Sequence, residues 1–209
     1  MKIPSLQLTE QDFISQGSHK KCYHYPGQPQ ACIKIPYNAG GVTDINREVF
    51  YLTRVLKNRG PQSGILPRYF GKVNTNFGQG HAFELVRDYD GNISQSIEAL
   101  LAKPVAQEDL LKLRTALIIM RERMVQYCII SMSIYPENIL YQRTGAHDFR
   151  LMLINDMGSG AAVPLEYIVP AMARAKIKRY WNRFVNSLPN RIDPAICAVL
   201  QEGLSFPTK

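Results

Sequence analysis

Several features that often reveal a protein's class are missing from this sequence of 209 residues. Apolar runs such as Ala116 to Met120 are far shorter than the ~20 residues that a helix needs to cross a bilayer. Residues 1–13 lack the apolar core of a secretion signal, so we expect a reducing, cytoplasmic setting. No internal repeat or low-complexity segment is visible. A fibrous repeat and wholesale disorder are therefore excluded.

Cysteine is scarce, and its spacing favours neither a disulfide framework nor a metal site. The chain has four cysteines and no Cys-x-x-Cys pair, and a domain of this size does not need disulfides to hold its core. Cys22, His24 and Cys32 cluster in the first strands, but no second close pair accompanies them to complete four zinc ligands. Ordinary strand residues are therefore favoured over a zinc site.

Acidic charge is also in short supply. The chain has 17 Asp and Glu against 25 Lys and Arg, which gives a formal net charge of +8. This balance favours polyanionic partners, namely nucleotides, nucleic acid or anionic lipid headgroups, without choosing among them. Hydrophobic residues make up 45% of the chain, which is enough to bury the core of one large domain or two small lobes.

The first half of the chain alternates short apolar runs with Gly, Pro and Asn, a pattern typical of strands and turns. The strands predicted here are Ala31–Ile35, Arg68–Val73 and His81–Val86. A helix is predicted after the loop 38–41, capped by Thr43 or Asp44 and running to about Lys57, with residues 60–64 ending it. This half is therefore expected to form a strand-rich lobe with one helix.

The second half changes to a helical pattern. Apolar residues recur at three- and four-residue steps within Glu108–Cys128, which predicts an amphipathic helix with a buried face. The members of this Leu/Met stripe are Leu110, Leu113, Leu117, Met120 and Met124. Two short strands, Ile139–Gln142 and Arg150–Ile154, and a final helical stretch over Leu165–Ser187 follow. The whole order predicts an α+β protein.

A small set of polar residues carries the chemistry. Lys34 lies in a predicted strand and Glu48 in the next helix, where the carboxylate can hold the ammonium in reach of phosphates. Asn138 and Asp156 stand on the two arms of a predicted hairpin and can converge on one Mg²⁺, which prefers oxygen ligands. Gly17 opens a turn that can cover phosphates.

These elements, in this order, resemble those of a protein kinase. The segment Ala31-Cys-Ile-Lys34 resembles the V-A-I-K strand, Pro136-Glu-Asn138 resembles the end of the catalytic loop, and Asp156-Met-Gly158 resembles D-F-G. The resemblance makes Lys34 the phosphate-binding lysine, Glu48 its helix partner, and Asn138 and Asp156 the metal ligands. It therefore implies ATP and Mg²⁺ as cofactors.

The resemblance also implies a layout. Phe83 to Val86 resembles the hinge whose backbone receives adenine, so Glu84 and Val86 become nucleotide-contact candidates. The expected fold is a truncated, bilobal kinase-like domain, with an N-lobe over about residues 1–86 and a hinge over about 83–91. A reduced helical C-lobe is expected over about 92–209.

More narrowly, the chain is similar to the YrbL family, small bacterial kinase-like proteins tied by name to the PhoP regulatory network. The similarity runs over roughly residues 5 to 190. It is carried by GSHKKCYHYPGQPQACIKI from Gly17, LPRYFG from Leu66, ISMSIYPENIL from Ile130, and Asn155-Asp-Met-Gly158. It implies a bacterial regulatory protein.

The sequence departs from the kinase pattern in the reacting half of the site. Ser133 stands where the catalytic Asp is expected, and Tyr135 stands where a γ-phosphate lysine is expected. A neutral Ser cannot accept the substrate proton, and Tyr135 supplies no cation. Gly17 is the one glycine of the phosphate-covering turn. Because phosphoryl transfer depends mainly on positioning and electrostatics, the departures predict a pseudokinase or a weak, atypical phosphotransferase.

Other interpretations remain open at this point. Glu48 can be a solvent-exposed helix residue, Asp156 a turn aspartate, and Asn138 a residue that merely fixes its loop. A small-molecule kinase resembling the aminoglycoside and choline kinases is disfavoured because those enzymes also need the loop Asp that Ser133 replaces. The most distinct alternative is a non-catalytic binding module that uses the basic C-terminal helix to bind nucleic acid, a membrane or a protein partner.

That helix combines cations and aromatics. Its cations are Arg174, Lys176, Lys178, Arg179 and Arg183, and they are interleaved with Tyr180, Trp181 and Phe184. The common arrangement for such a helix has the aromatics packed inward and the charges in solvent.

Overall fold

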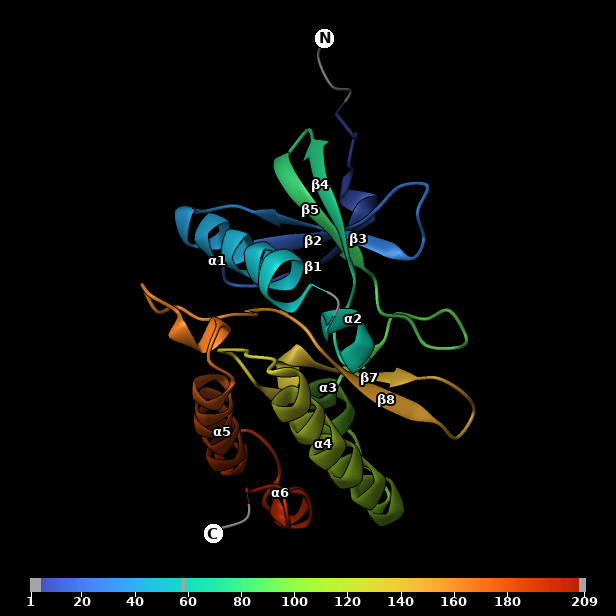
Figure 1. Ribbon diagram of the computed structural model, residues 1–209. Helices are drawn as coiled ribbons and strands as arrows, with labels where there is room; N and C mark the ends of the chain where they lie inside the picture. Colours follow the sequence, from blue (N-terminus) through green and yellow to red (C-terminus); the bar gives the residue numbers. More distant parts are fainter. Residues whose placement is uncertain (1–4, 58, 207–209) are drawn as a thin grey trace.

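The computed structural model describes residues 5–57 and 59–206. A strand-rich lobe stands above a helical lobe, and the chain passes from one to the other after β5 (Figure 1). The α+β, two-lobed architecture predicted from the order of elements is confirmed. Within the described ranges, none of the helices combines the length and the apolar character that a membrane span requires.

The N-lobe is built on one five-stranded antiparallel sheet with the order β1-β2-β3-β5-β4. Its strands are β1 Phe13–Gln16, β2 Lys20–His24, β3 Ala31–Pro36, β4 Tyr69–Thr75 and β5 Gly78–Glu84, and a 3-10 turn, η1 Glu10–Asp12, precedes them. Alternate residues of β3 serve opposite faces, as a pleated strand requires. Ile33 and Ile35 pack with Tyr23 and Leu8 on one face, while Cys32 packs toward α1 on the other.

The helix α1 (Ala39–Phe50) begins earlier than the sequence predicted. Asn38 is the N-cap, since its side chain accepts a hydrogen bond of 2.8 Å from the Gly41 backbone N–H. The predicted caps Thr43 and Asp44 were therefore wrong, and residues 39–41 form the first turn rather than a loop. Two glycines hid this start, because glycine is normally a poor helix former.

The segment after α1 also differs from the prediction. A π-helical turn, η2 Tyr51–Leu56, extends the helix, and a short helix, α2 Arg59–Ser63, occupies most of the stretch predicted to terminate it. The strand β5 ends at Glu84, so Leu85 and Val86 belong to the connection between the lobes.

The C-lobe combines a small antiparallel sheet, β6-β7-β8, with helices that pack beside it. Its elements are β6 Gln95–Ser96, α3 Ile97–Leu101, α4 Gln107–Tyr127, η3 Pro136–Asn138, β7 Ile139–Arg143, β8 Phe149–Leu153, η4 Leu165–Tyr167, α5 Pro170–Ser187, η5 Leu188–Asn190 and α6 Pro194–Gln201. The last predicted helix is thus divided into a 3-10 turn and α5. Pro170 starts α5, where a missing backbone N–H costs nothing.

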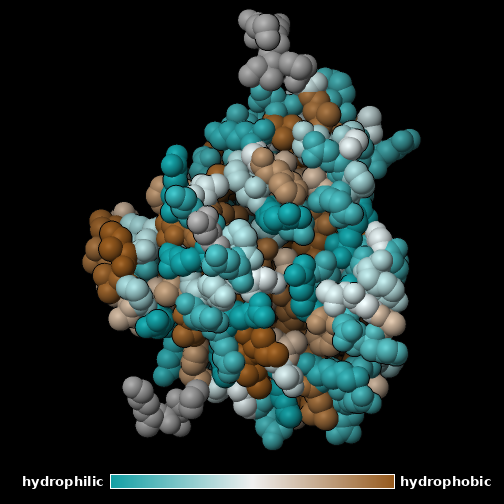
Figure 2. Space-filling view, turned by 45° about the vertical axis from the view of Figure 1, so that its right-hand side comes forward, coloured by the Kyte–Doolittle hydropathy of each residue, from teal (hydrophilic) through white to brown (hydrophobic). Residues whose placement is uncertain are grey.

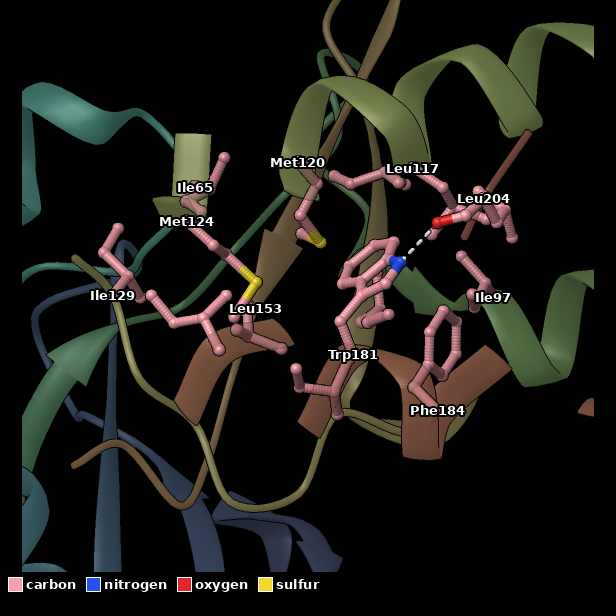
Figure 3. Packing of buried hydrophobic residues seen from close by; sticks show 14 of the residues in the cluster. Ile65, Ile97, Leu117, Met120, Met124, Ile129, Leu153, Trp181, Phe184 and Leu204 are labelled. Carbon is pink, nitrogen blue, oxygen red and sulfur yellow. Dashed lines mark hydrogen bonds between the residues drawn. The ribbon is translucent and has the colours of Figure 1, made fainter. Parts of the chain in front are cut away.

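The core of the C-lobe is the Leu/Met stripe of α4 packed against the aromatics of α5. All five stripe residues are buried, as predicted. Figure 3 shows Met120 and Leu117 facing Trp181, whose indole N–H donates a 2.7 Å hydrogen bond to the Leu204 carbonyl. Trp181 and Phe184 are fully buried. Trp181 and Phe184 of the basic helix therefore belong to the core, while its cations are exposed except for Lys176, which is largely buried in a pair with Glu166.

Tyr51 ties the two lobes together just behind the cleft. Its hydroxyl donates to the Cys128 carbonyl at 2.7 Å and accepts from the Ile130 N–H at 2.9 Å. Cys128 caps α4 in the left-handed conformation (φ 54°), so the chain turns there into the loop that carries Ser133. Burial raises the pKa of the Tyr51 phenol. The neutral hydroxyl thus fixes where this loop begins relative to α1.

The helix α1 packs closely against the β1–β2 loop at Gly41, and substitutions at its two glycines test this packing. A Cβ added at Gly41 would lie 2.2 Å from the His19 backbone carbonyl oxygen, whereas one at Gly40 would meet the mobile end of the His19 ring at 3.2 Å. We expect Gly41→Ala to lower the free energy of unfolding by about 1–3 kcal/mol, as overpacking does. The measurement is urea denaturation, and Gly40→Ala is the matched control, expected to be neutral or stabilising. Equal effects of the two substitutions would contradict this packing.

Candidate functional site

A cleft of about 400 Å³ lies between the β1–β2 loop, β3 and the loops that surround β7 and β8. Among the residues that line it are Gly17, Lys20, Lys34, Asn138 and Asp156. Residues from four separate stretches of the sequence therefore meet here, and the predicted phosphate and metal residues are among them.

The centre of the cleft wall is a buried carboxylate shared by two lysines. Glu48 is 1% exposed, and its two oxygens lie 3.5 Å from Lys34 Nζ and 3.5 Å from Lys20 Nζ. Lys34 is 8% exposed, and its ammonium also lies 4.5 Å from the centre of the Phe83 ring. One anion between two cations gives this trio a net charge of +1, in a cleft that is also lined by the carboxylates of Asp44, Glu137 and Asp156.

The Glu48 carboxylate keeps Lys34 charged. Burial by itself lowers the pKa of Lys34. The attraction of Glu48, together with that of neighbouring groups, raises this pKa by more, so the net pKa of Lys34 lies above its ordinary value. A buried charge is tolerated only with such a partner. The alternative interpretation, in which Glu48 is a solvent-exposed helix residue, is therefore wrong.

Asn155 is a cleft residue that the sequence analysis missed. Its side-chain oxygen accepts a 2.9 Å hydrogen bond from Lys34, and its amide nitrogen donates to Asn138 Oδ1 at 3.0 Å. Asn138 in turn donates to the Ser133 carbonyl at 3.1 Å. Asn155, rather than its neighbour Asp156, is therefore the residue of this loop that contacts Lys34. This series of hydrogen bonds connects the lysine of the N-lobe to the loop of the C-lobe that carries Ser133.

The backbone explains why Asn155 and Asp156 point different ways. Both residues are left-handed, with φ of 66° and 50°. Asn and Asp are the non-glycine residues that tolerate this region best, so the Asn-Asp pair after an apolar strand was the available signal. Asp156 turns toward α1, where its carboxylate lies 3.6 Å from Arg47. Arg47 also pairs with Asp44 at 3.1 Å, and Arg47 Nε has no hydrogen-bond partner among the described residues.

The residues at the altered catalytic positions have structural contacts instead. Ser133 accepts the Asn138 hydrogen bond through its carbonyl, and its backbone N–H donates to the Ser131 hydroxyl at 3.3 Å. The Tyr135 ring lies beneath the Arg191 guanidinium, 4.3 Å from the ring centre. Neither side chain presents a carboxylate or an ammonium to the cleft.

The β1–β2 loop is held along the rim of the cleft. The Tyr37 hydroxyl donates to the Gly17 carbonyl at 2.8 Å, and the Tyr37 N–H donates to the His19 carbonyl at 3.2 Å. The His19 ring also lies 3.2 Å from the Asn38 side chain. The turn predicted to cover phosphates is therefore anchored to the start of α1, beside the lysine pair.

The two hinge candidates do not line this cleft. Glu84 directs its carboxylate to Arg68, whose backbone N–H donates at 3.1 Å. Val86 is buried, and its carbonyl accepts from the Ser94 N–H at 3.1 Å. The residues expected to receive adenine thus make contacts within the connection between the lobes, while the residues expected to bind phosphate and metal line the cleft.

The donors in the cleft fit Mg²⁺ better than a transition metal. Within residues 5–57 and 59–206, no group of three or more His, Cys, Asp or Glu is placed to hold a metal ion, so Cys22, His24 and Cys32 form no zinc site. Asp156 supplies a carboxylate at the cleft, and Asn138 Oδ1 retains a lone pair beside its bond from Asn155. Two oxygen donors plus phosphate oxygens and water are the usual Mg²⁺ complement.

A second charged cluster fixes the segment that follows Gly158. The Glu166 carboxylate accepts from the Ser159 hydroxyl and pairs with Lys176 of α5. Burial by itself raises the pKa of Glu166. The hydrogen bonds from Lys176 and Ser159 lower this pKa by a larger amount, so the net pKa falls to about 2. The Ser159 N–H also donates to the Tyr167 hydroxyl at 2.7 Å. The segment is therefore tied to α5 and to η4.

Comparison with known proteins identifies the class and then the family. A crystal structure of a kinase domain is similar with a TM-score of 0.51 over 72% of this chain, at 12% sequence identity. The chain spans about half of that kinase, since the match covers 51% of it. The fold is therefore kinase-like, in reduced form.

The family described as PhoP regulatory network protein YrbL matches residues 6–189, and the chain belongs to this family. The YrbL proteins of Escherichia coli (strain K12) and Shigella flexneri are each 31% identical over 201 residues. Each match covers 95% of this chain and 92% of the relative. The family resemblance stated from the sequence is confirmed.

The Glu166 cluster predicts a pH dependence of stability. A carboxyl whose pKa is held at about 2 in the folded chain, below its ordinary 4.5, stabilises the fold fully above about pH 4.5 and loses this contribution as the pH falls toward 2. We expect Glu166→Gln to lower the free energy of unfolding at pH 7 and to reduce the loss seen on acidification. Urea denaturation at pH 7 and pH 3 measures both. Exposed Glu98 supplies the control, Glu98→Gln. A Glu166→Gln profile parallel to the wild type would contradict the assignment.

Proposed function

We propose that this chain is a kinase-like regulatory protein that binds the phosphates of a Mg²⁺–nucleotide in the cleft, as a pseudokinase or a weak, atypical phosphotransferase. The observation that carries the proposal is the pair of lysines on one buried carboxylate. Lys20 and Lys34 converge on Glu48 from neighbouring strands. Ammonium groups held in this way bind phosphate as fixed point charges.

The surplus cation offsets one of the sequence departures. Tyr135 removes the loop cation expected near the γ-phosphate, while Lys20 adds a cation on the N-lobe side of the same cleft. Asn138 and Asp156 would hold Mg²⁺, which neutralises phosphate charge when it is bound. The site is therefore suited to hold a polyphosphate, whereas the groups that act on the terminal phosphate are reduced.

Regulation fits this division of the site. The family description refers to a regulatory network, and the chain keeps phosphate-binding groups while Ser133 offers no carboxylate to accept a proton. We propose that nucleotide occupancy, rather than rapid turnover, is the property that matters in this protein.

The binding claim is tested by thermal stability in the presence of nucleotides. Mg-ATP at about 100 times its Kd is expected to raise the free energy of unfolding by about 2.7 kcal/mol. Mg-ADP should act more weakly and AMP least, because each phosphate removed takes away negative charge that the lysines and Mg²⁺ would bind. Lys20→Met and Lys34→Met should each reduce the response, and Lys72→Met on exposed β4 is the control. No shift with millimolar Mg-ATP in the wild type, or an equal shift with AMP, would refute phosphate recognition.

The turnover claim needs a separate measurement. We expect ATP hydrolysis or transfer below the ~1–100 s⁻¹ that is typical of kinases. Because Ser133 engages the site through its backbone, Ser133→Ala should leave any residual rate unchanged, while Asp156→Asn should remove it. A rate in the normal kinase range, or one that is lost in Ser133→Ala, would show that the serine takes part in the chemistry.

A further inference from the structure

The segment of residues 161–172, between the Asp156 loop and the body of α5, exposes an unusual amount of apolar surface. Ile168 is 82% exposed and Val163 is 72% exposed. We call this segment with its protruding aliphatic side chains the apolar ridge; these side chains are Val163, Leu165, Ile168, Val169 and Met172. Figure 1 shows the segment, in orange, reaching out from the side of the molecule at the level where the lobes meet.

The ridge carries no exposed charge. Its one ionisable acid is Glu166, which is buried and neutralised by Lys176 and the Ser159 hydroxyl. Inward burial of this acid leaves the outer surface of the segment purely apolar. Phe50 of α1, which is also exposed, extends the surface, because its ring lies 6.5 Å from that of Tyr167.

Cations adjoin the ridge. Met172 and Ala175 share a shallow groove on α5 with Lys176 and Arg179. Arg174 and Lys178 are exposed on the same helix. Between residues 157 and 192 the chain has one acidic residue, Glu166, and six basic residues: Arg174, Lys176, Lys178, Arg179, Arg183 and Arg191. Lys176 is paired with Glu166 and Arg191 with Glu137, so the cations of α5 that have no ion pair among the described residues are Arg174, Lys178, Arg179 and Arg183.

We propose that the apolar ridge and the cations of α5 form a docking surface for an anionic lipid membrane. Aliphatic side chains that protrude from a loop suit insertion among lipid headgroups, and cations beside them suit anionic headgroups. Figure 2 shows a group of apolar side chains that projects at one edge of the molecule. A peptide-binding groove would instead present its apolar side chains in a concave surface.

This surface is distinct from the phosphate cleft, and it does not depend on the proposed nucleotide binding. Because the ridge lies at the level where the lobes meet, as the cleft does, docking would hold the cleft near the lipid surface (Figure 1). Attachment through a few aliphatic side chains and several cations is peripheral and reversible, and it weakens as salt is added.

Vesicle flotation tests the proposal. Vesicles of phosphatidylcholine with 30% phosphatidylglycerol should bind the full chain, and vesicles of phosphatidylcholine alone should bind it much less. Ile168→Asp should weaken binding at least about tenfold, the scale for removing one large aliphatic side chain from an apolar contact. The double substitution Lys178→Gln with Arg179→Gln should weaken it about thirtyfold, at ~1 kcal/mol for each cation.

The matched control is Ile119→Asp on α4, where the isoleucine is 47% exposed outside the ridge. Its binding should equal that of the wild type. Because Ile168 is largely in solvent, circular dichroism should show both variants folded. Absence of wild-type binding to either vesicle, or an equal loss in Ile119→Asp, would overturn the proposal. A lipid-free dimer that Ile168→Asp dissociates would also overturn it, in favour of a second copy as the occupant.

Discussion

The arrangement of the N-lobe depends on one buried anion. Glu48 lies on α1, Lys20 on β2 and Lys34 on β3, so the carboxylate fixes the helix against two strands. A carboxylate with 1% exposure would be costly without partners. With two lysine partners it becomes the anchor of one wall of the cleft, where this trio of side chains has a net charge of +1. The hydrogen bonds from Lys34 to Asn155 and from Asn155 to Asn138 then carry this arrangement across to the C-lobe.

The two halves of the site have diverged. The half that we propose to bind phosphates has Lys20 in addition to Lys34, while the half that would act on a substrate has Ser133 and Tyr135 in structural contacts. The hinge residues Glu84 and Val86 are occupied by contacts within the protein. This asymmetry is consistent with the proposed binding of a polyphosphate without rapid transfer, and less consistent with a fully active kinase. The apolar ridge adds a surface that would place such a sensor at a membrane.

The sequence predicted those parts of the fold that follow from periodicity and motif order. The Leu/Met stripe of α4 and the strand that carries Lys34 are defined by local patterns, and both were found where expected. The start of α1 was missed because Asn38 caps a helix whose first turn contains two glycines, of which Gly41 is required by the close approach of the His19 carbonyl. Asn155 was missed because its role depends on consecutive left-handed residues, which no spacing rule reveals. Lys20 was passed over for a related reason, since its partner Glu48 is remote in sequence and adjacent only in the folded lobe.

The central claim is that the cleft recognises phosphates through the lysines that share Glu48. The most direct measurement is a crystal structure of the chain with Mg²⁺ and a non-hydrolysable ATP analogue. The account predicts phosphate oxygens within hydrogen-bond distance of both Lys20 Nζ and Lys34 Nζ, with the metal between Asp156 and the phosphates. An analogue bound elsewhere, or bound in the cleft with its phosphates directed away from both lysines, would contradict it.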